Sequence, residues 1–591
     1  MPIKRWYTKK IDVGVKNNWY YKRIDQEDGQ LKKKWTPVFV MAGIVLLLFG
    51  GAVGIQLVQR YMPSKNQADI GELLGITDDV SQAAIYLNGE LQEEKGLVDG
   101  EQMYLPVTWV DEYVNEKFYW DDVEKMLVYT LPDSIVYADK RTLGSNGQPL
   151  VVEKEGQIYL SVGLVSNYTN IRTELYNGNY YDSVVYSRIY VDTDWSPWQQ
   201  GTASKNTAVR VDSDIKSDVI VNLSKGDTFR IEEQSTDWSR VRTESGYMGY
   251  IQNKRIGQVE TKQETSLFIE PEYTSISLGE EVSLVWHQVT SMEANSALST
   301  LMANTQGVNV VAPTWFALTD NDGGYVSYGS QNYVNLAHDM GLQVWAVVDN
   351  FNQGTNVDSA VLFAKTSVRK KLIASLMEEV QNLGLDGLNL DIEGIKSSAG
   401  PQYVQFIREL SVACRNAGII LSVDNYVPMP YNSFYNWAEQ GRMVDYYIIM
   451  AYDEHYAGGE AGSVSSISYV ENGITDTLKY VPASKTVCAL PFYTRVWTES
   501  GNETSSSALG IQGAKQWIED NQVELYWQEE LGQYYGSIQK DDAVKEIWME
   551  EETSLGLKMN LISKYQLAGA AFWKLGFEPA SVWDVCKISD K

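Results

Sequence analysis

The chain has 591 residues, a formal net charge of −28 and only three cysteines. That length exceeds one ordinary hydrophobic core, so several domains are expected. So few cysteines exclude a disulfide framework, and three histidines far apart in sequence argue against a zinc site. The acidic balance, with no basic patch beyond the N-terminus, argues against nucleic acid as a partner.

The N-terminus differs in composition from the rest of the chain. Residues 1–34 carry ten Lys or Arg and four acidic residues, and residues 36–58 carry no charge. A helix of about 20 apolar residues spans a hydrocarbon core of about 30 Å. A cleaved signal peptide is the alternative, but its apolar region is usually only about 7–15 residues long. We predict a single-pass anchor in the cell membrane, with a cytoplasmic N-terminus and the remainder extracellular.

Two segments of the next region repeat each other. "GEQMYLPVTWVDEYV" (100–114) matches "EGQIYLSVGLVSNYT" (155–169) in both apolar and aromatic positions. A repeat indicates paired supersecondary units that bury a shared face. The stretch resembles the small α+β domain called copper amine oxidase N-terminal-like, although the sequence shows no cluster of metal ligands. We interpret its aromatic residues as core and cross-strand pairs.

Residues 200–260 alternate short apolar runs with turn signals such as "SKGD" and "ESGY". This pattern predicts a small all-β barrel. The order of Val209, Gly226, Trp238 and Gly249 resembles that of a bacterial SH3 domain. Such domains often bind wall peptides, and a spacer is the alternative, because a fold does not determine a function.

From about residue 280 onward, apolar strands alternate with helical stretches. The predicted strands are 282–286, 308–314, 342–348, 385–393, 419–424, 444–452, 485–491 and 568–574. Their near-continuous apolar character fits a parallel sheet that is buried on both faces. Eight such units predict a (β/α)8 TIM barrel. A doubly wound open sheet is the rival, but the opening strand lacks the Gly-rich turn of the dinucleotide-binding version.

The stretch "LDGLNLDIEG" (385–394) alternates polar and apolar residues. Asn389, Asp391 and Glu393 therefore share one face of the predicted strand. In a barrel this face points inward, and Glu393 lies at the C-terminal end, where barrel enzymes place their catalytic groups. Crowding raises the pKa of one carboxyl, so Glu393 is a candidate general acid with Asp391 as its charged neighbour. A strand with its polar face in water is the alternative.

The same stretch resembles the strand-4 signature of glycoside hydrolase family 18, Asp-Gly-x-Asp/Asn-x-Asp-x-Glu. Three further segments agree with that family: "MAYDEH" (450–455), "LPFYTRVW" (490–497) and "GAAFWKLGFE" (569–578). "APTWF" (312–316) and "DNY" (424–426) resemble the branch that acts on bacterial peptidoglycan, including spore cortex-lytic glucosaminidases. The resemblance spans about 300 residues of this region, the size of one TIM barrel.

The resemblance implies a retaining mechanism in which the substrate's own 2-acetamido group is the nucleophile. Glu393 then acts as acid and base, Asp391 orients the acetamido group, and Tyr452 donates a hydrogen bond to it. The implied substrate-binding residues are Trp573, which stacks under the sugar ring, Asp453, Asn389, Tyr493 and Trp315. Asn389 departs from many chitinases, which carry Asp there, and so removes one charge from the coupled group. No cofactor or metal is implied.

We therefore predict an enzyme that cleaves β-1,4 bonds after N-acetylglucosamine in cell-wall peptidoglycan. A chitinase and a catalytically silent sugar-binding or scaffold protein are the alternatives. Silent members of the family usually lose the final Glu, whereas this chain keeps Glu393. The predicted organisation is a basic cytoplasmic tail (1–35), a transmembrane helix (36–58), a linker (59–77), a duplicated α+β domain (78–196), an SH3-like domain (200–260) and a family 18 barrel (278–591).

Overall fold

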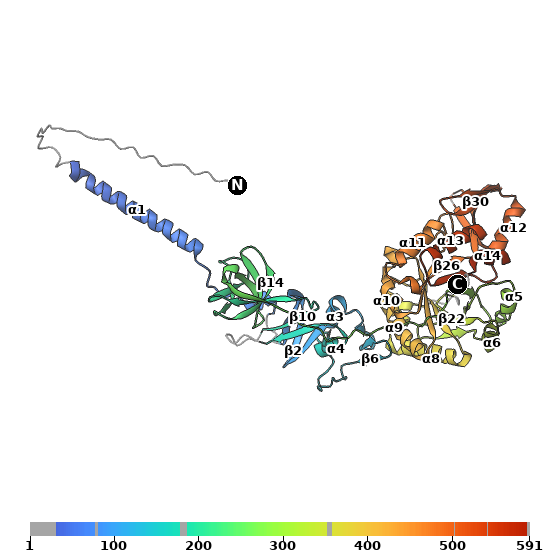
Figure 1. Ribbon diagram of the computed structural model, residues 1–591, viewed down its shortest axis with the longest axis horizontal. Coiled ribbons are helices and arrows are strands. Elements are labelled where there is room, and N and C mark those ends of the chain that lie inside the picture. The colour runs from blue at the N-terminus through green and yellow to red at the C-terminus, as the bar shows by residue number, and fades with distance from the viewer. Residues whose placement is uncertain are drawn as a thin grey trace, which may run out of the picture. The chain divides into compact units, whose positions relative to one another are not determined.

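The chain divides into two compact units, each built from two stretches that are far apart in sequence. The computed structural model describes residues 31–76, 81–177, 186–351, 357–501, 503–540 and 542–587 (Figure 1). One unit comprises Met1–Leu73 and Ser196–Gln263, and the other comprises Leu74–Trp195 and Glu264–Lys591. The second unit contains the barrel and therefore the predicted catalytic residues.

The first unit begins with helix α1 (Leu31–Tyr61). Within it, Val40–Tyr61 has a mean hydropathy of 2.2, and none of its most apolar window is buried. Its length and composition suffice to cross a membrane, although a signal sequence near an N-terminus meets the same criteria. The membrane anchor therefore stays a prediction.

Residues 198–262 of the first unit form an all-β sheet, as predicted. The sheet has the order β13-β12-β16-β15-β14-β11-β17. The strands are β11 (Trp198–Ala203), β12 (Thr207–Arg210), β13 (Val219–Leu223), β14 (Thr228–Gln234), β15 (Trp238–Thr243), β16 (Met248–Gln252) and β17 (Ile256–Lys262). Val209 and Val241 are fully buried in its core. The predicted linker is partly fixed here, since Ser64 N donates to Ile215 O and the segment leads into α2 (Ile70–Leu74).

The second unit opens with a seven-stranded sheet of order β7-β8-β3-β2-β1-β10-β9. The strands are β1 (Gln82–Leu87), β2 (Glu90–Asp99), β3 (Gln102–Pro106), β7 (Val151–Lys154), β8 (Gln157–Ser161), β9 (Arg172–Tyr176) and β10 (Ser187–Asp192). In each copy of the sequence repeat, a strand leads directly into a helix, α3 (Val107–Tyr113) or α4 (Val162–Tyr168). β3 and β8 pair antiparallel, with buried Leu105 opposite buried Leu160, so the repeated segments pack against each other.

A three-stranded sheet, β4 (Tyr119–Asp121), β5 (Met126–Thr130) and β6 (Ile135–Ala138), joins this part to the barrel helices. The buried Asp121 carboxylate accepts hydrogen bonds from Thr366 N at 2.6 Å and Thr366 Oγ1 at 2.7 Å. Thr366 is the first residue of helix α8, so Asp121 supplies the cap that this helix end requires. The Arg369 guanidinium lies 5.0 Å from the centre of the Tyr119 ring.

Eight parallel strands close into the predicted (β/α)8 barrel, because β19 pairs with both β18 and β22. The strands are β18 (Val282–His287), β19 (Val310–Pro313), β22 (Gln343–Asp349), β23 (Gly387–Asp391), β24 (Ile420–Tyr426), β25 (Tyr446–Met450), β26 (Thr486–Pro491) and β32 (Gly569–Trp573). One apolar cluster, with Trp286 and Trp345, fills the barrel interior. A second cluster, with Leu388 and Leu390, packs between the strands and the surrounding helices.

The barrel helices are α5 (Leu298–Met302), α6 (Gln331–Asp339), α7 (Ser359–Leu362), α8 (Thr366–Leu383), α9 (Gly400–Ala417), α10 (Trp437–Met443), α11 (Ile467–Thr477), α13 (Glu552–Lys564) and α14 (Trp583–Cys586). The two longest, α8 and α9, end at Gly384 and Gly418, whose φ angles are 66° and 70°. Only glycine adopts this left-handed conformation freely, so both residues stop a helix and turn the chain into the next strand.

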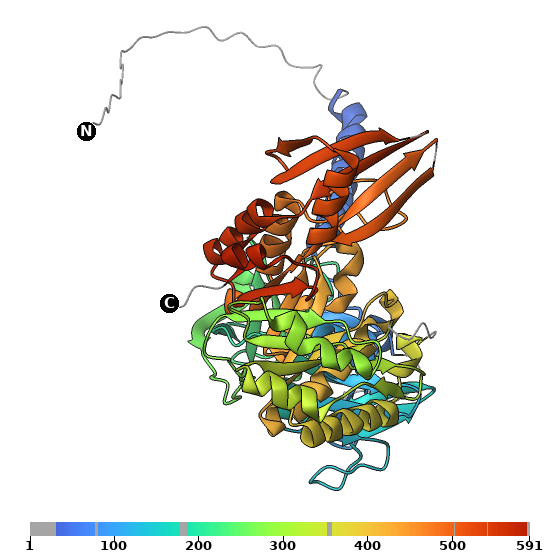
Figure 2. The same cartoon turned by 90° about the vertical axis from the view of Figure 1, so that its right-hand side faces the viewer.

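A five-stranded antiparallel sheet is inserted between β26 and β32. It consists of β27 (Tyr493–Ser500), β28 (Glu503–Gly510), β29 (Leu525–Gln528), β30 (Gln533–Lys540) and β31 (Ala543–Met549), with helix α12 (Ile511–Asn521) after β28. Figure 2 shows its long strands, coloured orange-red, extending beyond the barrel helices. One face packs through Val496, Ile547 and Met549 onto the outer barrel cluster. A short hairpin of β20 (Phe316–Leu318) and β21 (Tyr325–Ser327) extends the barrel sheet beside β22.

Candidate active site

The polar face of β23 points into the barrel. Leu388 and Leu390 are fully buried in the outer cluster, so the intervening residues face inward. Asn389 confirms this direction, because its Oδ1 accepts a hydrogen bond of 3.0 Å from Nε1 of Trp286, an interior residue. Glu393 follows two residues after β23 ends, at the C-terminal mouth of the barrel.

Three carboxyl groups lie side by side at this mouth, at the ends of three adjacent parallel strands. Asp349 of β22 is in register with Asp391 of β23, and the pairing of Leu390 with Val423 makes Asp424 of β24 the next neighbour. All three aspartates are buried. Burial raises the pKa of Asp391 well above its ordinary value, and the neighbouring carboxyls raise it further.

Glu393 is half-buried and is held on both its backbone and its carboxylate. The Asn350 side chain forms two hydrogen bonds with the main chain of Glu393. Asn350 Oδ1 accepts from Glu393 N at 2.9 Å, and Asn350 Nδ2 donates to Glu393 O at 2.8 Å. The Tyr426 hydroxyl donates to Glu393 Oε2 at 2.6 Å. Burial raises the pKa of Glu393, while the Tyr426 hydrogen bond acts in the opposite direction. The net rise favours a carboxyl that keeps its proton at higher pH than an exposed glutamate does.

Two tyrosines and an aspartate form the neighbouring wall. The Tyr493 hydroxyl donates to Asp453 Oδ1 at 2.6 Å, and the rings of Tyr452 and Tyr493 are 6.2 Å apart. Burial raises the pKa of the Tyr452 phenol well above its ordinary value, and the nearby Asp391 carboxyl raises the pKa of this phenol further. Tyr452 therefore stays protonated and is able to donate a hydrogen bond into the mouth.

Trp573 completes the site from the end of β32. Its ring is partly exposed and lies 6.0 Å from the ring of Trp286, tilted by 56°. An indole with one face in contact with the barrel interior and part of its surface exposed suits stacking on a sugar ring. The mouth thus combines a half-buried glutamate, an adjacent buried aspartate, a phenol donor and an aromatic platform.

Comparison with known proteins identifies this barrel. The family model described as "Glycosyl hydrolases family 18" matches residues 290–578. This barrel is a glycoside hydrolase family 18 domain. A glycosylase of Bacillus subtilis named YvbX is 24% identical over 296 residues, which cover 48% of this chain and 85% of that protein. The "Cortical fragment-lytic enzyme" of Bacillus subtilis is 25% identical over 232 residues, which cover 38% of this chain and 54% of that enzyme.

Among solved structures, the spore cortex-lytic enzyme SleL of Bacillus cereus aligns at 18% identity with a TM-score of 0.48. The alignment covers 55% of this chain and 77% of that one.

Two of the residues predicted to bind substrate have fully buried side chains in the family 18 domain. Trp315 is fully buried in the outer cluster, where its Nε1 donates to Asn295 Oδ1 and its ring packs edge-on against Tyr333. These contacts place its side chain among core residues, and its role in substrate binding stays a prediction. Asn389 is also fully buried, and its amide bonds Trp286, Ser422 and Asp424. These bonds hold Asn389 in place between neighbouring strands, and its role in substrate binding stays a prediction.

Sequence reasoning missed Asn350, Tyr426 and Asp424 as parts of the family 18 site. Tyr426 and Asp424 are two residues apart on β24, so both point inward, and the quoted "DNY" already contained that signal. In the part of the chain that the structure describes, no group of three or more His, Cys, Asp or Glu side chains is placed to hold a metal ion.

A row of aromatic residues leads from the family 18 site across the outer face of the inserted sheet. The register places Tyr526 opposite Tyr535, and Tyr535 opposite Trp548. The next position in this row is Arg495, whose guanidinium lies 3.9 Å from the Asp453 carboxylate of the site. Tyr526 is 57% exposed, and the other two rings are partly exposed. A linear ligand in the mouth therefore has an aromatic surface along which to continue.

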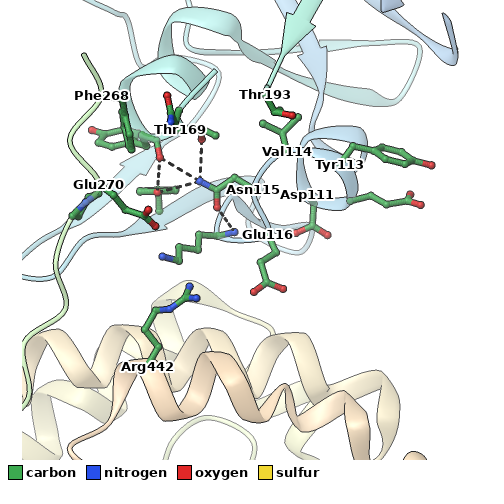
Figure 3. A pocket seen from close by; sticks show the side chains of 16 residues that line it. Asp111, Tyr113, Val114, Asn115, Glu116, Thr169, Thr193, Phe268, Glu270 and Arg442 are labelled. Carbon is green, nitrogen blue, oxygen red and sulfur yellow. Dashed lines mark hydrogen bonds between the residues drawn. The ribbon is translucent and has the colours of Figure 1, made fainter. Parts of the chain in front are cut away.

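A separate pocket of about 550 Å³ lies away from the barrel mouth (Figure 3). Its lining comes from the α3–β4 segment, the end of α4, the 268–271 segment and Arg442 of α10. The Asn115 amide in its wall already bonds Tyr168 O and Thr169 Oγ1, as the dashed lines in Figure 3 show. Its lining contains none of the predicted catalytic residues.

Proposed function

We propose that the family 18 domain cleaves β-1,4 bonds after N-acetylglucosamine in cell-wall peptidoglycan, on the outer side of the membrane. The observation that carries this proposal is the pairing of half-buried Glu393 with buried Asp391 beside Tyr452 at the barrel mouth. The B. subtilis relative named as a cortical fragment-lytic enzyme supports wall glycan as the substrate class. Chitin hydrolysis and silent sugar binding are the alternatives.

In the proposed mechanism, the substrate's 2-acetamido oxygen attacks the anomeric carbon and forms an oxazolinium ion. Glu393 donates its proton to the leaving glycosidic oxygen, and its raised pKa keeps that proton available. Asp391 faces the acetamido nitrogen and stabilises the positive charge that develops there. Water then opens the ion, with Glu393 now acting as the base, so the anomeric configuration is retained.

The remaining groups orient the sugar. Tyr452 donates its hydroxyl proton to the acetamido oxygen, and Trp573 stacks under the ring. Tyr493 fixes the Asp453 carboxylate, whose second oxygen is then available to a sugar hydroxyl. These groups hold the acetamido oxygen near the anomeric carbon, and such positioning removes part of the entropic barrier.

A substrate-assisted mechanism makes activity depend on the N-acetyl group. A thiazoline analogue of N-acetylglucosamine should inhibit competitively, because it mimics the bound oxazoline, and removal of the N-acetyl groups from purified wall glycan should abolish cleavage. The measurement is the release of new reducing ends, with their identity established by mass spectrometry. Efficient hydrolysis of the de-N-acetylated glycan would rule the mechanism out, and activity on chitin alone would favour the chitinase alternative.

We further propose that α1 anchors the enzyme, with the barrel facing the wall. Protease added to intact cells stripped of their wall should degrade the chain after residue 60 and spare the first 34 residues. This expectation rests on the basic leader and on the apolar Val40–Tyr61 segment. Immunoblots with antibodies to each end are the readout. A mature protein that begins near residue 60 would contradict the anchor and indicate a signal peptide.

We propose that the aromatic row of the inserted sheet binds the glycan beyond the reacting bond. Trp548→Ala should raise KM for long wall glycan roughly three- to tenfold, the effect of losing about one stacking contact. It should leave KM for a short oligosaccharide unchanged. Trp527→Ala is the matched control, because Trp527 pairs with Tyr534 and lies on the opposite face of the same sheet. Equal effects of both variants on long glycan would contradict the proposal.

We propose that the all-β domain that resembles an SH3 domain binds wall peptide and so forms a second contact with the wall. A spacer of similar size has no affinity for such peptides. Binding of the isolated wall peptide to the full chain, compared with a chain from which residues 200–260 are removed, separates the two.

A further inference from the structure

A second buried carboxyl group, Asp424, lies directly beside the proposed catalytic aspartate. Asp424 lies on β24 and is 2% exposed. Its Oδ1 accepts a hydrogen bond of 2.8 Å from Asn389 Nδ2. Within the described residues, Asp424 Oδ2 has no hydrogen-bond partner, and neither does Oδ1 of the adjacent Asp391. Two neighbouring buried carboxyls thus each keep one oxygen unsatisfied, which is costly unless a proton lies between them.

The orientation of Asn389 is fixed, so its contact with Asp424 is fixed as well. The indole Nε1 of Trp286 is only a donor, and therefore the Asn389 atom that faces it must be the oxygen. The Asn389 nitrogen then points to Ser422 Oγ and to Asp424 Oδ1. Asn389 itself has no acidic proton to share. Three carboxyls act on Asp391, namely Asp349, Glu393 and Asp424, and among the described residues only Asp424 of these three has a buried oxygen without a hydrogen-bond partner. Asp424 is therefore the matching site for a proton shared with Asp391.

The electrostatic surroundings favour one proton on this pair. The groups that act on the two carboxyls are other carboxyls and phenols: Asp349, Glu393, Tyr403 and Tyr452. Burial raises the pKa of Asp424 well above its ordinary value; the Asn389 hydrogen bond opposes this rise, and the charge of Glu393 adds to it. Two buried carboxyls on adjacent strands do not both ionise without a cation beside them.

We infer that Asp424 is a positioning residue for catalysis, which shares one proton with Asp391 and takes that proton when Asp391 must carry a negative charge. The inference rests on the proposed function. In the empty site the proton lies between the two carboxyls and limits their repulsion. When the oxazolinium ion forms, the proton resides on Asp424, and ionised Asp391 faces the positive charge. No proton is gained or lost overall, because the proton only moves from one carboxyl to the other.

Asp424→Asn and Asp424→Ala separate a proton-sharing role from a structural one. The Asn variant keeps an oxygen that accepts from Asn389 but cannot exchange a proton, whereas the Ala variant loses both. We expect kcat to fall at least tenfold in both variants, with KM within about twofold of wild type, since Asp424 does not touch the sugar. Ser422→Ala is the control, because it removes another Asn389 partner and no carboxyl, and its kcat should stay within about threefold of wild type.

The pH dependence of stability gives a readout that does not require activity. A carboxyl whose pKa is raised on folding binds more protons in the folded state, so its contribution to stability is complete at acidic pH and is lost as the pH rises through that raised pKa. Asp424→Asn has no such group. Its melting temperature, relative to wild type, should therefore rise steadily from acidic to alkaline pH. Infrared difference spectra should also lose a protonated carboxyl band in this variant.

The inference fails if Asp424→Asn keeps wild-type kcat, or if its melting temperature differs from wild type by a constant amount at every pH. If Asp424→Ala loses kcat but Asp424→Asn keeps full activity, the proton-sharing role is contradicted. The hydrogen bond to Asn389 is then the only role left for Asp424. An inactive wild-type enzyme on every N-acetylglucosamine polymer would instead contradict the proposed function. In that case the infrared and melting measurements still decide whether the pair holds a proton.

Discussion

Glu393→Gln should lower the turnover of wall glycan by roughly 100- to 10,000-fold, the usual contribution of general acid catalysis. The amide keeps the shape of the side chain and still accepts the hydrogen bond from Tyr426, but it has no proton to give to the leaving oxygen. Because the sugar-stacking and acetamido contacts are unchanged, affinity for the glycan should largely survive. Turnover, glycan binding and thermal melting should be measured on the same preparation.

Glu378→Gln is the matched control, because it makes the same chemical change on the exposed surface of α8. Near-normal turnover in Glu393→Gln would remove Glu393 from the role of acid. Failure of Glu393→Gln to fold would instead indicate that the polar face of β23 is structural. The raised pKa of Glu393 adds a pH signature: wild-type kcat should fall as the pH rises through that pKa, since only the protonated form donates.

The periodicity of residues 385–394 was sufficient to predict the geometry of β23. A period of two places Asn389 and Asp391 on one face, and the structure finds that face inside the barrel. The eight barrel strands were predictable for a related reason: strands that are buried on both faces are apolar throughout and separated by helical stretches. The closed barrel followed from the number of such units.

The partners of Glu393 were not predictable in this way, because they depend on the register between strands. Asn350 follows β22 and Tyr426 ends β24, more than 30 residues away on either side. Only the parallel pairing of these strands brings their ends to Glu393. Trp315 shows the limit of a sequence motif, since an aromatic residue near a strand end suits either a sugar platform or a core, and in this structure its side chain is fully buried.

The inserted sheet also escaped sequence reasoning. Its strands are half-exposed and rich in Ser, Thr, Gln and Glu, so they lack the apolar runs that identified the barrel. Besides the apolar packing of Val496, Ile547 and Met549, a buried polar contact attaches this sheet to the barrel. Glu550, directly after β31, is fully buried and forms an ion pair of 2.5 Å with Lys558 of α13, which is fully buried as well. Gln533 and Ser554 donate further hydrogen bonds to the same carboxylate.

Lys558→Met should therefore destabilise the enzyme by about 3–5 kcal/mol, the usual effect of leaving one member of a buried ion pair without its partner. Met replaces the apolar part of the lysine side chain, so most of the loss comes from the uncompensated Glu550 carboxylate. Burial already raises the pKa of Glu550, and removal of the ammonium should raise it further, so the loss should diminish at acidic pH. Urea unfolding at neutral and acidic pH is the measurement.

Two further variants decide whether the unpaired charge of Glu550 causes the loss of stability in Lys558→Met. Adding Glu550→Gln to Lys558→Met removes the orphaned charge and should recover a large part of the stability, because a buried pair is replaceable by uncharged groups of similar shape. Lys515→Met breaks the partly exposed pair with Glu552 and should cost no more than about 1 kcal/mol. If Lys558→Met costs no more than Lys515→Met, or if the double variant is as unstable as the single one, the contact between β31 and α13 is held by packing. If the expectation holds, the Glu550–Lys558 pair fixes the position of β31. Trp548 lies in this strand, two residues before Glu550, so the pair also fixes the ring that we propose contacts the glycan.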